Sequence, residues 1–245
     1  MILQNIAMLL TSSSRSKAYV QLLAKNDLLP SFCLLMTTDE NVLENEASTY
    51  IKQGEDNGYF NVDEPLLYTL RLYNIPYIII SANNVNAPNV IDAIKRIKHQ
   101  YIIYSGFAGQ ILRGELFKIG KKYLHVHPGL LPSYRGSTTL YYSLLSEGIC
   151  GATAIFLDEG IDTGNILMSK TFAAPRGNVN LDYVFDPYIR AETLVSLMRD
   201  FVTTGQFVAR EQELDLGDVF YIIHPVLKHI AILMHINAGR DGYHV

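Results

Sequence analysis

Short apolar runs and amphipathic stretches alternate along most of this chain. Runs such as Tyr77–Ser81 and Tyr101–Ser105 are hydrophobic at successive positions, which is typical of strands in a parallel sheet that helices cover on both faces. Between these runs, apolar residues recur three and four positions apart, as on one face of a helix. The pattern predicts a doubly wound α/β fold with a mostly parallel sheet. The predicted strands are 5–10, 32–36, 77–81, 101–105, 123–127, 153–158 and 166–172, and the predicted helices are 18–23, 66–73, 90–97 and 184–201.

The alternation of strands and helices stops near residue 180. We therefore divide the chain into an α/β domain, residues 1–180, and a C-terminal extension of helix and strand, residues 181–245, packed on it. The apolar segments of the extension would either cover the sheet or join two copies as a homodimer, and the sequence leaves both open. The polar region 38–61 is expected to form loops and a short helix.

Composition limits the partners and the compartment. Hydrophobic residues make up 49% of the chain, and the formal net charge is −4, which argues against a nucleic-acid partner. The N-terminal apolar run stops after about ten residues, well short of the ~20 that a membrane span needs, so no membrane association is expected. Cys33 and Cys150 have neither paired nor metal-ligand spacing. We expect them to be buried thiols in a cytoplasmic protein.

The first candidate for chemistry is residues 123–136, YLHVHPGLLPSYRG. His125 and His127 alternate on a predicted strand, so their side chains point to the same side. Prolines and glycines then force an irregular loop directly after the strand. Ligands of doubly wound folds bind at such carboxyl ends of strands, so a binding site is expected there.

The second candidate is residues 157–164, LDEGIDTG, which place three acids in five positions after another predicted strand. Histidine and a carboxylate are a common pair in proton transfer, because the acid orients the ring and stabilises its cationic form. A buried, structural pair of histidines beside an acidic turn would produce the same pattern. The residue types alone leave both readings open.

The two segments together, HPGLLPSYRG and DEGIDTGNIL, resemble the signature of the folate-dependent formyltransferases. That family includes the methionyl-tRNA, glycinamide ribonucleotide and amino-sugar N-formyltransferases. Its pattern is Asn-x-His-x-Ser-Leu-Leu-Pro with an Asp further on. This chain departs from the pattern at two positions, with His125 in place of the Asn and Gly129 in place of the Ser. The resemblance implies a Rossmann-like fold and an N-formyltransferase that uses 10-formyltetrahydrofolate and needs no metal.

The resemblance also implies roles for three catalytic residues. His127 would manage the proton that leaves the attacking amine and help to stabilise the tetrahedral oxyanion. Asp162 would orient His127 and balance its charge. His125 would take over the hydrogen bond that the family's Asn donates to the oxyanion, since an imidazole N–H can also donate.

By the same resemblance, backbone groups of two loops would hold the pterin ring of the folate. The first loop has Gln110 where an Arg is common in the family, and a plain turn is the alternative for its glycines. The expected contacts are Phe107, Gln110, Ile111 and Leu112 in the first loop, and Leu157, Asp158, Glu159 and Gly160 in the second.

The expected acceptor is a small-molecule amine, that of an amino sugar, either nucleotide-linked or of the nonulosonate type, in surface-glycan biosynthesis. A tRNA acceptor is disfavoured because the residues after Asp162 are not basic and are few for a further RNA-binding domain. A purine-pathway acceptor and a formyltetrahydrofolate hydrolase are the alternatives. Ser12 and Arg15 near the first predicted helix, and Tyr134 and Arg135 in the histidine loop, are candidate acceptor contacts.

Two further readings compete with formyl transfer. His-x-His with a downstream Asp also resembles a metal site, which His224, His229 and His235 would complete; these three read better as one face of a helix. A non-catalytic domain that has kept the fold is disfavoured by the presence of both His127 and Asp162.

Overall fold

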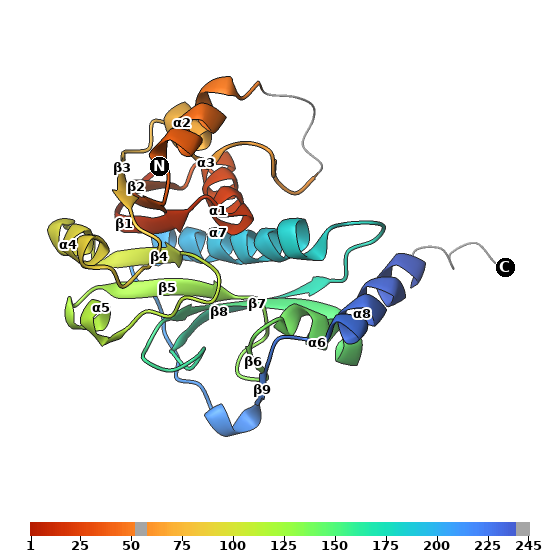
Figure 1. The fold of residues 1–245 in the computed structure, drawn as a ribbon. Helices are drawn as coiled ribbons and strands as arrows, with labels where there is room; N and C mark the ends of the chain where they lie inside the picture. The colour runs from red at the N-terminus through yellow and green to blue at the C-terminus, as the bar shows by residue number, and fades with distance from the viewer. Residues whose placement is uncertain (52–57, 239–245) are drawn as a thin grey trace.

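The computed structural model describes residues 1–51 and 58–238 (Figure 1). Parts of the expected 38–61 loop and of the C-terminal extension fall on 52–57 and 239–245 and lie outside the described residues, as does the side chain of His235. Within the described part, the chain forms one large sheet with helices on both faces, and a small two-stranded sheet beside it.

The large sheet has seven strands in the order β3-β2-β1-β4-β5-β7-β8. All neighbouring pairs from β3 to β5 are parallel, while β7 runs antiparallel to β5, and β8 antiparallel to β7. The predicted mostly parallel, doubly wound fold is thereby confirmed. The strands are β1 (Ile2–Thr11), β2 (Leu29–Thr37), β3 (Tyr77–Ser81), β4 (Tyr101–Ser105), β5 (Lys122–His127), β7 (Ile149–Phe156) and β8 (Ile166–Ala173).

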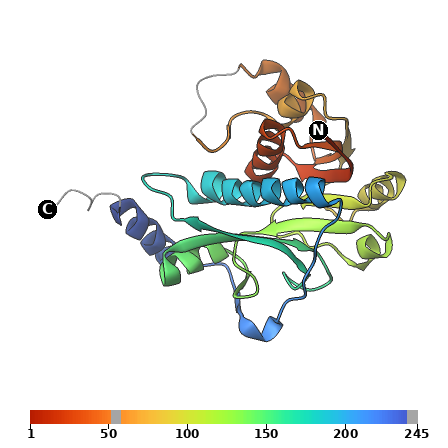
Figure 2. The same cartoon turned by 180° about the vertical axis from the view of Figure 1, so that it is seen from behind.

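Helices α1 (Ser14–Lys25) and α7 (Asp186–Thr204) pack against each other on one face of the sheet (Figure 2). Their buried apolar side chains share a core with α2 (Glu40–Thr49) and α3 (Leu66–Leu72). The other face is covered by α4 (Pro88–Arg96) and α5 (Gly114–Lys118), which bury a second apolar cluster. Helix α4 buries Val90 and Ile94 on one apolar stripe, as the spacing of hydrophobic residues predicts, whereas α1 is buried all along residues 18–24.

The strand order reverses between β1 and β4, because the chain winds outward through β2 and β3 before returning beside β1. Such a switch point leaves a crevice at the carboxyl ends of the two strands, where ligands of this architecture bind. Helix α1 starts there, and the side chain of its N-cap, Ser13, accepts a hydrogen bond from the backbone N–H of Ser16.

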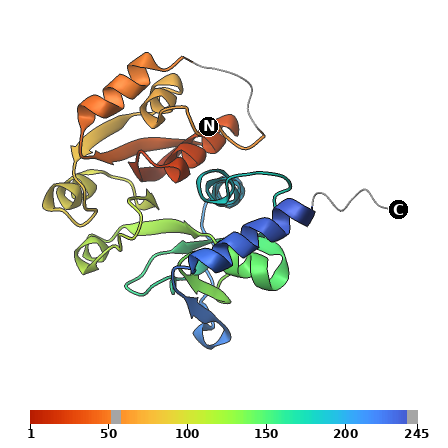
Figure 3. The same cartoon turned by 45° about the vertical axis from the view of Figure 1, so that its right-hand side comes forward.

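Two short elements follow β5 where the sequence predicted only an irregular loop: β6 (Tyr134–Gly136) and α6 (Thr139–Glu147). Strand β9 (Asp218–Phe220), from the C-terminal tail, pairs with β6 in parallel. Helix α8 (Pro225–Ala238) lies beside α6 (Figure 3). Single turns at Leu181–Phe185 and Leu214–Leu216 complete the elements. Through β9 and α8, the C-terminal tail therefore packs against the segment that follows the two histidines.

Cys33 and Cys150 are both buried and free, as predicted. Burial raises the pKa of both thiols, that of Cys150 to about 12. None of the helices in residues 1–51 and 58–238 has both the length and the hydropathy of a membrane span.

Candidate active site

Three loops surround the two histidines of β5: residues 106–112 after β4, 128–136 after β5, and 157–164 between β7 and β8. Because β7 runs antiparallel to β5, it ends beside Leu124, and Thr153 is the residue paired with His127. The 157–164 loop therefore folds back along the sheet to bring Asp162 to His127. The sequence predicted that the histidines and the acid meet because they follow neighbouring strand ends. In the structure they meet because the 157–164 loop returns along the sheet toward His127.

His127 has hydrogen-bond acceptors at both ring nitrogens. Its Nδ1 lies 3.3 Å from Oδ2 of Asp162, and its Nε2 lies 2.7 Å from the carbonyl oxygen of Tyr134. A second acceptor, Oγ1 of Thr139, lies 3.3 Å from Nε2, and its own proton goes to the carbonyl of Pro128. Both ring nitrogens of His127 are therefore engaged by groups of the protein. The side chain is only 2% exposed.

Gly129 allows this position of the His127 ring. A Cβ on Gly129 would lie 2.9 Å from each of three atoms: Nε2 of His127, Oγ1 of Thr139 and the carbonyl oxygen of Tyr134. A serine at this position, as in the family's pattern, would therefore crowd the ring. The carbonyl of Gly129 is itself fixed, because it accepts a hydrogen bond of 2.7 Å from Oγ1 of Thr153.

Asp162 is held in a left-handed backbone conformation, with φ of 56°, that residues other than glycine rarely adopt. Its Oδ2 accepts a hydrogen bond from the backbone N–H of Gly136, at 3.0 Å. Burial favours the neutral acid, but the hydrogen bond from His127, the electrostatic interactions with the two histidines and the Gly136 N–H outweigh it and lower the pKa of Asp162 to about 2. Asp162 is therefore a carboxylate across the physiological range.

Gln212 fixes the backbone of this loop and was missed by the sequence reasoning. Its Nε2 donates to the carbonyls of Asp162, at 3.0 Å, and of Gly164, at 2.5 Å. The residue lies fifty positions beyond Asp162 on an irregular segment, so no local pattern indicates it.

Replacing Gln212 with Ala should lower kcat about tenfold, since loss of the two hydrogen bonds loosens the strained loop that carries Asp162, and small misplacements of catalytic groups cost up to about 10²-fold. Gln206→Ala, on the exposed turn after α7, is a matched control that should leave kcat unchanged. Steady-state kinetics of both variants, with circular dichroism to check folding, makes the comparison. An unaltered kcat in the Gln212 variant would show that the loop holds Asp162 without it.

His125 lies on the same side of β5 as His127 and is more open, being half-buried. Its Nδ1 faces the carbonyl oxygen of Tyr104 at 3.5 Å. Burial, reinforced by the positive charges of Arg15 and Arg190, holds the pKa of His125 well below its ordinary value. Its imidazole is therefore neutral near neutral pH.

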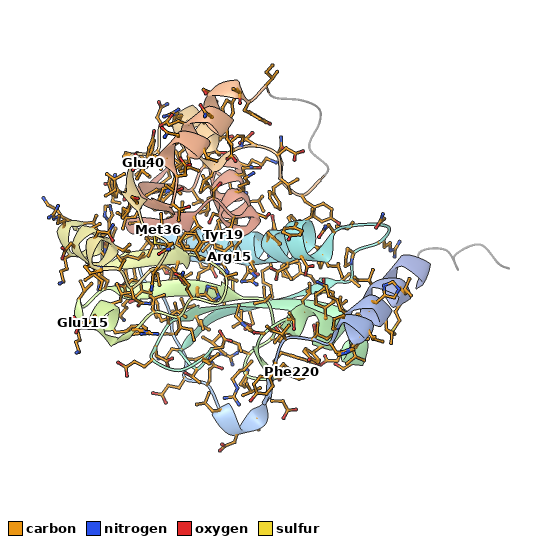
Figure 4. The ribbon with its side chains drawn as sticks, viewed as in Figure 1. Arg15, Tyr19, Met36, Glu40, Glu115 and Phe220 are labelled. Atoms are coloured by element: carbon orange, nitrogen blue, oxygen red, sulfur yellow. The ribbon has the colours of Figure 1, made fainter. Side chains whose placement is uncertain are left out.

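Arg15 lies at the switch point, in the first turn of α1, with Tyr19 one turn further on (Figure 4). Its Nε donates to Oγ of Ser105 at 3.0 Å, and its Nη2 to the carbonyl of Gly106 at 2.7 Å. Burial lowers its pKa, and the neighbouring Arg190 adds to this effect. Ser12 at the same end of β1 is exposed. The structure thus brings Arg15 close to His125, whereas the side chain of Ser12 is exposed to solvent at the end of β1.

Arg190 is a second site residue that the sequence reasoning missed. From α7 its Nη1 donates to the carbonyl of Val126, between the two histidines, at 3.2 Å. Its Nε donates to Asp186 at 3.0 Å. Only the i, i+4 spacing of Asp186 and Arg190 was visible in the sequence, and that spacing is typical of ordinary surface pairs.

The two loops expected to hold a pterin approach each other. Phe107, Leu112 and Leu157 pack in one apolar cluster, and a Cβ on Gly114 would lie 3.3 Å from Oε1 of Glu159. Each loop exposes one isoleucine, Ile111 at 52% and Ile161 at 57%. Both loops therefore present an apolar side chain to solvent.

Other expected pterin contacts have internal partners. Gln110 bridges the loop to residues 83–85, accepting from Val85 N at 2.8 Å and donating to the carbonyl of Asn83 at 2.6 Å. The Asp158 carboxylate accepts from the backbone N–H of Gly160 and from Thr163 Oγ1. The side chains of Gln110 and Asp158 therefore hold their own loops in shape. Gly160 takes part in the second loop through its backbone N–H, which donates to Asp158.

Tyr134 and Arg135 were expected to contact the acceptor substrate. Their side chains instead hydrogen-bond to other parts of the protein and hold β6 in place. Tyr134 Oη hydrogen-bonds with Ser146 at 2.6 Å and donates to Glu147. Arg135 donates to the carbonyls of Leu214 and Gly217, each at 2.9 Å. The Tyr134 contact with the site is made by its main-chain carbonyl.

Residues 36–177 match the formyl transferase domain family. The match spans more than half of the chain, and the chain therefore belongs to the formyl transferase family. In the described residues, no group of three or more His, Cys, Asp or Glu side chains is arranged to hold a metal ion.

The chain is similar to the methionyl-tRNA formyltransferase of Geotalea uraniireducens (strain Rf4), at 27% identity over 202 residues, which cover 81% of this chain and 61% of that protein. Matches to two further methionyl-tRNA formyltransferases cover 40% and 51% of those proteins. The chain thus spans less than two thirds of the length of these curated relatives.

Solved structures share the fold. A sugar N-formyltransferase from Shewanella sp FDAARGOS_354 superposes with a TM-score of 0.55 at 18% identity, covering 93% of this chain and 86% of that one. WlaRD, a sugar 3N-formyl transferase crystallised in the presence of dTDP and 5-N-formyl-THF, gives a TM-score of 0.55 at 18% identity, with 89% and 69% covered. At such identities the likeness supports the fold alone.

Proposed function

We propose that this protein transfers a formyl group from 10-formyltetrahydrofolate to the amine of an amino sugar. The observation that carries the proposal is the buried His127–Asp162 pair, with 3.3 Å between Nδ1 and Oδ2, together with the neighbouring loops 107–112 and 157–161, whose apolar side chains pack in one cluster. The folate would supply an activated formyl group. The protein would bind the donor along residues 107–112 and 157–161 and surround the formyl oxygen with hydrogen-bond donors.

The amino-sugar acceptor is supported by the sugar N-formyltransferases among the fold neighbours, of which WlaRD was crystallised with dTDP. The curated sequence relatives are methionyl-tRNA formyltransferases, and a net charge of −4 suits a tRNA acceptor poorly. Arg15 at the crevice, with Arg190 behind it, supplies positive charge that favours an acidic, nucleotide-linked sugar.

The decisive experiment incubates the protein with 10-formyltetrahydrofolate and one acceptor at a time: nucleotide-linked amino sugars, glycinamide ribonucleotide and methionyl-tRNA. Mass spectrometry should find one added formyl group on an amino sugar. Formylation of only the nucleotide precursor or the tRNA would reject the sugar acceptor. Release of formate without any acceptor product would identify a hydrolase instead.

Activity is expected to survive treatment with a chelator, because the proposed chemistry assigns every charge and proton to side chains and to the folate. The measurement is the initial rate of formyl transfer before and after EDTA treatment and desalting. A loss of rate that zinc restores would favour the metal-dependent alternative.

A further inference from the structure

His125 and His127 have different hydrogen-bonding partners, although they lie two residues apart on one strand. Both nitrogens of His127 face acceptors, Asp162 on one side and the Tyr134 carbonyl on the other. Both ring nitrogens of His127 are thereby engaged by groups of the protein, and the side chain is only 2% exposed. His127 is therefore poorly placed to take a proton from an attacking amine.

His125 has the complementary arrangement. Its Nδ1 faces the Tyr104 carbonyl, an acceptor, which favours the tautomer with the proton on Nδ1 and the lone pair on Nε2. Within the described part of the chain, Nε2 of His125 makes no hydrogen bond with another residue. The ring is half-buried, whereas His127 is almost completely enclosed. Of the two rings, His125 is the one with an accessible lone pair.

Charged neighbours support the same assignment. The groups that face His125 are Arg15 from α1, Arg190 from α7, Asp162 from the 157–164 loop and His127 on its own strand. Burial and the two guanidinium groups lower the pKa of His125, and Asp162 opposes them only in part. Two titratable groups whose environments differ in this way commonly divide the acid and base roles of a site.

We infer that Nε2 of His125 accepts the proton of the attacking amine, while both ring nitrogens of His127 stay engaged by Asp162 and the Tyr134 carbonyl. The inference rests on the proposed formyl transfer. An asparagine, which the family's pattern has at this position, cannot accept that proton, so the substitution gives this chain a base of its own.

The proton and electron balance is complete with these groups. The amine nitrogen forms a bond to the formyl carbon, and the C=O π electrons move to the oxygen. The proton on that nitrogen passes to Nε2 of His125. The C=O bond then re-forms, the bond to the carrier nitrogen breaks, and that nitrogen takes the electron pair and the proton from His125.

His125→Asn separates the two roles, because an amide can donate to an oxyanion but cannot act as the base. We expect kcat to fall by about 10²-fold or more, the usual worth of a positioned proton acceptor, with little change in the KM of the acceptor. His125→Ala should be similarly slow, and added imidazole should restore part of its kcat in proportion to the free base. His99→Asn, at a histidine stacked on Phe32, is the matched control.

A His125→Asn variant with kcat within about threefold of the parent would overturn the inference and return His125 to a donor role. Nitrogen-15 NMR of histidine-labelled parent protein provides a test that needs neither activity nor a variant. It should show a protonated Nδ1 and an unprotonated Nε2 on His125 at neutral pH, and a protonated Nε2 on His125 would also overturn the inference. If the parent enzyme formylates no amine at all, the proposed function fails, while the NMR result still decides the tautomers.

Discussion

Replacing either His127 or Asp162 with Ala is expected to lower kcat by about 10²-fold, the cost of misplacing groups at the centre of the proposed site. His127 lies two residues from His125 on β5, and Asp162, 3.3 Å from its Nδ1, orients the His127 ring. Asp162 also accepts the Gly136 N–H, so its loss loosens β6 as well. Steady-state kinetics at saturating folate gives the effect on kcat directly.

The two residues should act as one unit. The double variant is therefore expected to be about as slow as the slower single variant, and the two losses should not multiply. Asp200→Ala, an exposed acid on α7, is the control for loss of a charge and should leave kcat unchanged. Losses that multiply in the double variant would show that His127 and Asp162 work independently.

Gly129→Ala is expected to lower kcat by up to about 10²-fold, the cost of a displacement of about 1 Å in a catalytic group. The new Cβ would lie 2.9 Å from Nε2 of His127 and from the fixed carbonyl of Tyr134. The ring is the part that can move, so it should leave the Tyr134 carbonyl. A crystal structure of the variant would show the new ring position.

Gly148→Ala provides the matched control for Gly129→Ala. Gly148 ends α6 with φ of 67°, and a Cβ there meets no atom within 4 Å. Its replacement should cost about 1 kcal/mol of stability through backbone strain and leave kcat unchanged. If Gly129→Ala keeps its kcat with the ring of His127 displaced, the contact with Tyr134 has no part in catalysis.

The hydrophobic pattern was sufficient to predict the large sheet, because its strands are continuous apolar runs separated by amphipathic helical stretches. The strands Tyr77–Ser81 and Tyr101–Ser105 were predicted with their observed ends. The segment 128–148 was harder to interpret. Its prolines and glycines indicate a loop, yet β6 forms there because β9, from far along the chain, pairs with Tyr134–Gly136, and α6 follows it with Leu140, Tyr141 and Leu144 buried.

The sequence by itself determined the fold class and the family and indicated His125, His127 and Asp162 as candidate site residues, since strand periodicity and a two-part motif are local properties of the chain. Only the tertiary structure decided how these residues differ. Which ring nitrogen meets an acceptor depends on the Tyr134 and Tyr104 carbonyls, and the pKa of His125 depends on Arg15 and Arg190. Hydrogen-bond direction and electrostatic environment come from groups that are distant in sequence and close in space, and the order of residues does not reveal them.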